Sequence, residues 1–121
     1  MTEHEKVTIA GQVPSKSNGY RIINSGGHAS LKKSDALKRY ETSFYMQMGV
    51  YRGLHVDGLF ELHMDVYFTS MSHDLDNSLK VVLDCLQNGG AIRNDNRCTH
   101  IVARKFIDKT NPRIEFRLIE L

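Results

Sequence analysis

Hydrophobic and polar residues alternate along several stretches of the chain. In the clearest stretch every second residue is apolar, namely Phe60, Leu62, Met64, Val66 and Phe68. A period of two predicts a half-buried strand over residues 60–68. Residues 7–11 and 113–121 alternate in the same way, and residues 98–107 (CTHIVARKFI) also read as a strand. We therefore expect four strands.

Two other stretches have the apolar period of a helix. The first follows Ser34-Asp35, a typical helix start, and ends at Gly53; its apolar residues are Leu37, Tyr40, Phe44, Tyr45 and Met48. The second lies in DLDNSLKVVLDCLQNGG and is closed by two glycines; its apolar residues are Leu75, Leu79, Val82, Leu83 and Leu86. The order β-α-β-α-β-β predicts an α+β fold, a single-layer mixed β-sheet with the two helices on one face.

A polar segment separates the first strand from the first helix. Residues 15–29 (SKSNGYRIINSGGHA) are rich in Ser, Asn and Gly and carry basic side chains. This composition predicts a long exposed loop. Tyr20 and Arg21 either contact a ligand, by stacking and ion pairing, or pack the loop onto the domain.

The length of 121 residues and the mass of 13.8 kDa predict one domain, residues 1–121. The net charge of +2 is unevenly distributed, with +5 over residues 13–40, −5 over 41–77 and +3 over 96–121. Basic segments around an acidic centre suit a domain that binds a polyanion and presents carboxylates to it. The alternative is chance clustering of charges on solvated surfaces.

Cysteine usage and hydropathy bear on the compartment. Cys85 and Cys98 form neither a CxxC pair nor a disulfide framework, so we expect reduced core residues. No apolar run reaches the roughly 18–20 residues that span a bilayer, and none at the start of the sequence has signal-peptide length. We expect a soluble, cytoplasmic protein with no membrane partner.

Residues suited to phosphodiester chemistry gather at the second predicted helix. Asp74 and Asp76 lie at its start, where the helix dipole favours ionised carboxylates. Lys80 follows Asp76 by one turn on the same face, and Asp95 lies on the next loop. Carboxylates hold Mg²⁺, which activates water and stabilises phosphate charge, and a lysine adds a fixed positive charge. The alternative is an ordinary helix cap and an ordinary i,i+4 ion pair.

The segment HDLDNSLKVVLDCLQNGGAIRNDNRC resembles the signature of the RusA family of Holliday junction resolvases. VPSKSNGYR resembles the basic loop near the N-terminus of that family, and PRIEFRLIEL resembles its last strand. The resemblance therefore spans essentially the whole chain in the order of the family. The run DLDN-x-x-K-x-x-x-D-x-L with a later acidic loop is much more specific than D-x-D alone.

The resemblance implies a small, homodimeric, Mg²⁺-dependent endodeoxyribonuclease that acts on branched DNA and is commonly encoded by phages and prophages. By position, the metal-binding aspartates of the family correspond to Asp74, Asp76 and Asp95, and its essential lysine to Lys80. These four are the expected catalytic residues. Asp84 also matches a recurrent helix position, and we interpret it as a surface or structural carboxylate.

Two positions depart from the family pattern. Paired aspartates are common where this chain has Asn94-Asp95, and we expect the second residue to be the ligand. Arginine often precedes the first aspartate, where this chain has His73. That histidine is expected to weaken phosphate binding or to make it pH-dependent.

The function that follows is resolution of four-way DNA junctions in recombination and repair. An isologous dimer presents one site to each of two opposed strands, and paired symmetric nicks separate the two duplexes. Phosphate contacts dominate DNA affinity, and we expect them from Lys16, Arg21, Lys32 and Lys33. Two alternatives stay open: a non-catalytic binder of branched or single-stranded nucleic acid, and a nuclease that cuts flaps or forks.

Overall fold

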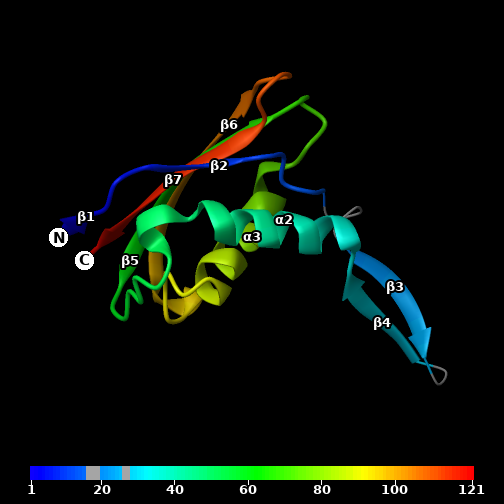
Figure 1. The fold of residues 1–121 in the computed structure, drawn as a ribbon, viewed down its shortest axis with the longest axis horizontal. Coiled ribbons are helices and arrows are strands. Elements are labelled where there is room, and N and C mark those ends of the chain that lie inside the picture. The colour runs from blue at the N-terminus through cyan, green and yellow to red at the C-terminus, as the bar shows by residue number, and fades with distance from the viewer. Residues whose placement is uncertain (16–19, 26–27) are drawn as a thin grey trace.

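A five-stranded mixed sheet forms the body of the protein (Figure 1). The computed structural model describes the backbone of residues 1–15, 20–25 and 28–121, and side chains outside residues 16–31. The strands of the sheet are β1 (Thr2–Glu3), β2 (Val7–Ala10), β5 (Phe60–Phe68), β6 (Cys98–Ile107) and β7 (Arg113–Glu120). β5 pairs antiparallel with β7 and parallel with β6, while β1 and β2 both pair with β7. The four predicted strands are confirmed, and β1 is an addition.

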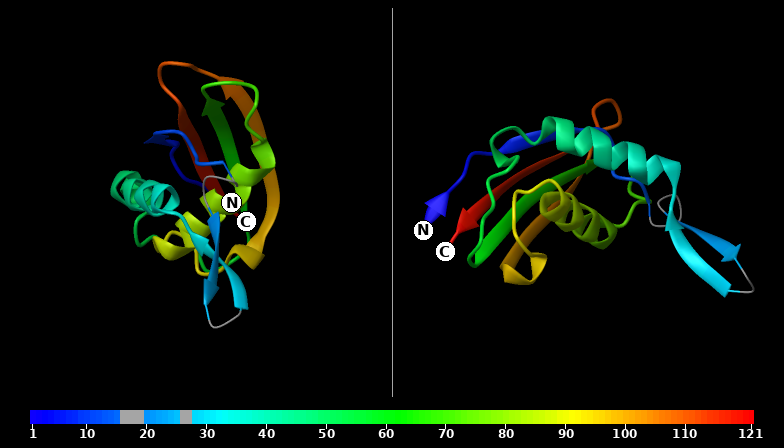
Figure 2. Two further views of the ribbon diagram at one scale, coloured as in Figure 1. Left: turned by 90° about the vertical axis from the view of Figure 1, so that its right-hand side faces the viewer. Right: turned by 60° about the horizontal axis from the view of Figure 1, so that its bottom comes forward.

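Both helices, α2 (Asp35–Gln47) and α3 (Leu75–Asn88), cover the same face of the sheet (Figure 2). The start of α2 is as predicted, because the Ser34 hydroxyl accepts a hydrogen bond from the Leu37 N–H at 3.2 Å. The helix ends before the predicted Gly53, since a single 3₁₀ turn, η1 (Gly49–Tyr51), begins at a glycine with a φ of 57°. Among the described residues, no helix has the length and hydrophobicity needed to cross a membrane.

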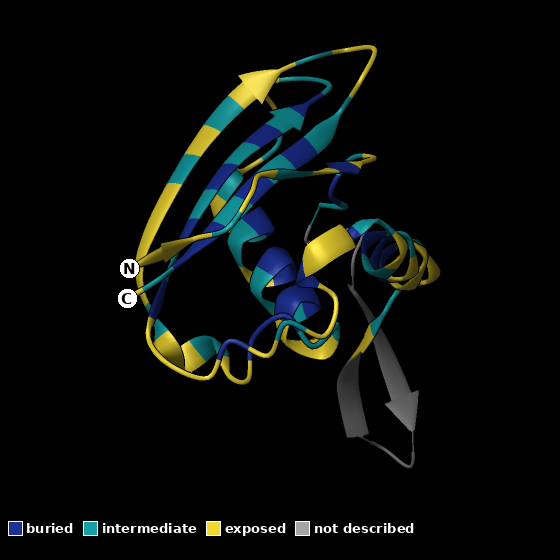
Figure 3. Cartoon of the chain, turned by 60° about the vertical axis from the view of Figure 1, so that its left-hand side comes forward, coloured by how far each residue is buried: buried dark blue, intermediate teal, exposed yellow. Residues whose placement is uncertain are grey.

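One hydrophobic core fills the space between the sheet and the helices (Figure 3). All five apolar residues predicted for the inner face of β5 are buried. They belong to one cluster with Phe44 of α2 and Val82 of α3. The Phe44 ring also stacks on Phe116 of β7, with 5.8 Å between ring centroids. The α+β class with two helices on one sheet face is therefore confirmed.

The opposite face of the sheet carries charged side chains that are paired with one another. Asp65 of β5 accepts from Arg104 of β6 at 2.8 Å, and Glu61 lies 3.0 Å from the His63 ring nitrogen. No described helix covers this face (Figure 2). Part of the acidic charge of residues 41–77 is thus neutralised locally and belongs to the solvated side of a strand.

Residues 20–33 differ from the predicted long loop. They contain a two-stranded antiparallel hairpin, β3 (Tyr20–Ser25) and β4 (His28–Lys33), which projects from the N-terminal end of α2 (Figure 1). Ser25 pairs with His28, and the sequence between these two residues is Gly-Gly. A Gly-Gly pair is a typical two-residue hairpin connection, and the polar composition around it concealed this signal.

Both cysteines are free thiols. Cys85 is fully buried in α3, and burial raises the pKa of its thiol to about 12. Cys98 is half-buried at the start of β6. The expectation of reduced cysteines in apolar surroundings therefore holds for Cys85, and Cys98 lies at the margin of the core.

Candidate active site

Two aspartates lie at the N-terminus of α3, as the spacing predicted. Asp74 is the N-cap residue, yet its side chain makes no capping hydrogen bond, and Asp76 lies in the first turn. Both are exposed, and neither carboxylate has a hydrogen-bond or ion-pair partner within the part of the chain that the structure describes. Two exposed carboxylates without partners among the described residues are therefore available to a ligand.

The loop that leads from β5 to Asp74 is held in place from three sides. The His73 ring stacks on Phe68, with 5.2 Å between centroids and 7° between planes. Gln12 accepts a hydrogen bond from the Thr69 N–H at 2.7 Å, and its amide nitrogen lies 3.3 Å from His73 Nε2. Lys105 of β6 donates to the backbone carbonyl groups of this loop. The His73 ring thus packs against the end of β5.

Lys80 lies one turn beyond Asp76 on α3. Its side chain is 73% exposed, and its ammonium nitrogen lies 3.5 Å from the carboxylate of Asp84, one turn further along the helix. Among the described residues, Asp84 is the ion-pair partner of Lys80, and Asp76 is not. This contact agrees with a structural role for Asp84. It leaves the lysine accessible to a phosphate, because a surface ion pair of this kind is weak.

Asp95 lies at the opposite end of α3. It begins the 3₁₀ turn η2 (Asp95–Arg97), and its N–H donates to the side chain of Gln87 at 2.9 Å. Gln87 belongs to the last turn of this 14-residue helix, which is about 20 Å long. Among the described residues, no group of three His, Cys, Asp or Glu side chains could hold a metal ion. One chain thus brings Asp74 and Asp76 together but leaves Asp95 at a distance from both.

Asn94, which stands where the resembling family often has an aspartate, has a local structural task. Its side-chain oxygen accepts a hydrogen bond from the Asn96 N–H at 2.9 Å and caps η2. An aspartate would cap the turn equally well, so the substitution does not disturb the backbone here. The acidic group of this loop is Asp95.

The predicted DNA contacts lie on or next to the hairpin. Lys32 is exposed and pairs across the hairpin with Arg21, so two basic residues occupy neighbouring positions. The Lys33 ammonium group lies 2.7 Å from the carboxylate of Glu41, which is itself buried. Lys16 and the side chain of Arg21 fall outside the described residues. Lys33 therefore ties β4 to α2, while Lys32 faces solvent.

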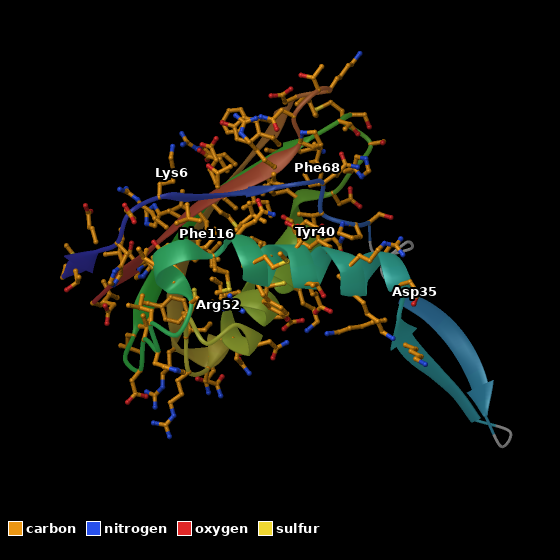
Figure 4. The ribbon with its side chains drawn as sticks, in the orientation of Figure 1. Lys6, Asp35, Tyr40, Arg52, Phe68 and Phe116 are labelled. Atoms are coloured by element: carbon orange, nitrogen blue, oxygen red, sulfur yellow. The ribbon has the colours of Figure 1, made fainter. Side chains whose placement is uncertain are left out.

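Two residues that support the site were not predicted from the sequence. Gln12 and Lys105 both contact the loop before Asp74, although they lie 57 and 34 residues away in the chain from their partners Thr69 and Met71. No local pattern marks such residues, since their contacts depend on the order of the strands in the sheet. Figure 4 shows Phe68 at the end of β5 from which this loop leaves.

The family model described as Endodeoxyribonuclease RusA matches residues 13–119, which covers the helices, the central strands and all four candidate site residues. None of the curated proteins matches the chain.

Proposed function

Because the chain belongs to the RusA endodeoxyribonuclease family, we propose that it resolves Holliday junctions by paired symmetric nicks, in a reaction that depends on Mg²⁺. The observation that supports this most is the pair of exposed carboxylates at the start of α3, Asp74 and Asp76, which have no partner among the described residues. The chain acts on DNA as an endodeoxyribonuclease. Beyond this activity, we propose that the preferred substrate is the four-way junction, that the metal is Mg²⁺ and that the protein acts in recombination and repair.

The residues present fit a hard divalent cation. Asp74 and Asp76 offer oxygen ligands of the kind that Mg²⁺ takes, and both are open to solvent, so water and phosphate oxygens can complete the coordination. A bound ion would activate a water molecule and stabilise charge on the phosphate. Lys80 directs a positive charge into solvent about one turn from Asp76 and would stabilise the same phosphate.

A homodimer is part of the proposal, and β6 is the surface that we assign to it. β6 pairs with β5 along one edge, and no described strand pairs with its other edge. Four of its apolar side chains are exposed: Ile101, Val102, Phe106 and Ile107. A long apolar edge strand is a template for pairing with another chain. A second copy of the same strand would cover it.

Two-fold symmetry then brings the separated aspartates together. Two copies of one edge strand that pair around a two-fold axis must run antiparallel, so the start of one β6 lies beside the end of the other. Asp95 begins the 3₁₀ turn η2, which directly precedes the start of β6, and Lys105 near the end of β6 contacts the loop that carries Asp74. We therefore propose that each metal site combines Asp74 and Asp76 of one subunit with Asp95 of the partner subunit.

Two further expectations belong to the same proposal. Residues 1–121 act as one nuclease domain, which the single hydrophobic core supports. The cytoplasmic location stays a prediction that rests on the free cysteines.

The variant Asp76→Asn tests the site. It keeps the size of the side chain and removes one metal-ligating charge, so cleavage of a synthetic four-way junction in Mg²⁺ should fall at least about 100-fold. Junction binding measured in EDTA should be preserved or strengthened. Asp84→Asn is the matched control on the same helix and should cut within a few-fold of wild type. A near-wild-type rate for Asp76→Asn would overturn the assignment.

The same assay separates the other functions. A non-catalytic binder would shift the junction in a gel without product, in Mg²⁺ as in EDTA. A flap or fork nuclease would cut those substrates faster than a junction of matched sequence. The cap made by Asn94 keeps the turn that begins at Asp95 in place, so the loop that carries the remaining carboxylate is retained in this chain.

A further inference from the structure

We propose that Lys105 is a positioning residue of the reaction, which orders the loop before Asp74 and so fixes the direction of the Asp74 carboxylate. The inference rests on the proposed function, because it takes Asp74 to be a metal ligand. Lys105 lies on β6, outside the motif that carries the other site residues.

The contacts of Lys105 converge on a short stretch of backbone. Its ammonium group donates to the carbonyl oxygen of Met71 at 2.9 Å and also to that of His73. The same nitrogen lies 5.6 Å from the centre of the Phe68 ring, on which the His73 ring is stacked. One cation thus connects the last residue of β5 with two residues of the loop.

The bond to His73 acts directly on Asp74. The carbonyl group of His73 and the N–H of Asp74 belong to one planar peptide unit, so a restraint on the first also restrains the second. Asp74 is in extended conformation at the helix N-cap, and its side chain makes no capping bond that would hold it. The direction of its carboxylate therefore depends on how the preceding peptide is held.

Lysine suits this task because its ammonium group carries three donors and can serve two carbonyl oxygens at once. A charged donor also makes stronger hydrogen bonds than a neutral one. Since both contacts are to backbone within the protein, the role of Lys105 is to position Asp74 and not to contact the phosphate. Partners of this kind, one step removed from a metal ligand, commonly change metal affinity or activity by about 10–100-fold.

The experiment compares Lys105→Met, which keeps an unbranched side chain as far as Cε and removes the donors and the charge, with Lys109→Met. Lys109 is exposed in the turn after β6, so the control removes the same charge from the same end of the sheet. Hydrogen exchange of a peptide covering residues 69–76 should accelerate about 10-fold or more in Lys105→Met and stay unchanged in Lys109→Met. Junction cleavage by Lys105→Met should show a kcat about 10-fold lower and a KM within about 2-fold of wild type.

A second variant covers the case in which Lys105→Met does not fold. Lys105→Arg retains donors for both carbonyl groups and should restore the slow exchange and at least part of kcat. Exchange and kcat like those of wild type in Lys105→Met, or an equal loss in Lys105→Arg and Lys105→Met, would overturn the proposal. The exchange measurement needs no catalysis, so its result is separable from that of the Asp76→Asn test. If exchange is accelerated in Lys105→Met while Asp76→Asn keeps full activity, Lys105 restrains the loop but the metal-site assignment is wrong.

Discussion

Neighbouring residues in this chain have different tasks, as Lys32 and Lys33 show. The two lysines are equivalent in the sequence, where both belong to a basic segment. In the fold, Lys33 neutralises the buried Glu41, and Lys32 is exposed on the hairpin. A contact of Lys33 with phosphate stays a prediction, to which the structure adds a role in stability.

Replacing each lysine by methionine should separate the two roles. Lys33→Met leaves a buried carboxylate without its cation, so the free energy of unfolding should fall by about 1–3 kcal/mol in urea denaturation. Lys32→Met should change it by less than about 0.5 kcal/mol. If Lys32 contacts a phosphate, the salt dependence of junction binding, as the slope of log K against log salt, should fall by about 0.9 in Lys32→Met. Equal destabilisation in both variants would contradict this division.

At the same scale, the sequence predicts some features of the site and not others. Asp74 and Asp76 could be placed at the start of a helix because Asp is a common N-cap and an apolar stripe follows. The ion-pair partner of Lys80 could not be predicted, because Asp76 and Asp84, four residues before and after it, are both acidic and both within reach on a helix. The structure selects Asp84.

At the scale of elements, the sequence predicts the strands and helices that have a regular hydrophobic pattern. It does not predict the contacts between them. The strand 60–68, the strand 98–107 and the helix of residues 75–88 follow the predicted periods closely, because one face of each is apolar or of strand-forming composition. The hairpin was missed because its strands are short and polar, and only Gly26-Gly27 marks it. No periodic pattern in the sequence predicts the contact between the ends of α2 and α3.

Such a contact occurs between the C-terminus of α3 and the end of α2. A methyl group added at Gly89, the C-cap of α3, would lie 2.8 Å from Met48 Cε and 2.9 Å from the carbonyl oxygen of Cys85. Gly89→Ala should therefore lower the free energy of unfolding by about 1–3 kcal/mol. Gly58→Ala, whose methyl group would meet nothing within 4 Å, should change it by less than about 1 kcal/mol. Thermal and urea unfolding measure both, and a neutral Gly89→Ala would show that the two helices separate more easily than described.

At the scale of the whole molecule, the sequence predicts the members of the site but not their distribution in space. Asp74, Asp76 and Asp95 lie within 22 residues, and the helix that connects them places the last one at its far end. This separation, together with the apolar edge of β6 with which no described strand pairs, is the basis of the proposed site shared between two subunits. The number of chains needed per site is a property that no pattern within one chain contains.

Complementation between two inactive variants tests that central claim most directly. Asp76→Asn and Asp95→Asn are co-expressed with different affinity tags, the mixed dimer is purified through both tags, and junction cleavage is measured in Mg²⁺. In a shared site, one of the two sites of the mixed dimer receives Asp74 and Asp76 from one chain and Asp95 from the other, all intact. The mixed dimer should then nick one strand per junction at about half the total rate of wild type, while each variant alone stays inactive. A mixed dimer as inactive as its parents would contradict the shared site, because each chain would then need all three of its own aspartates.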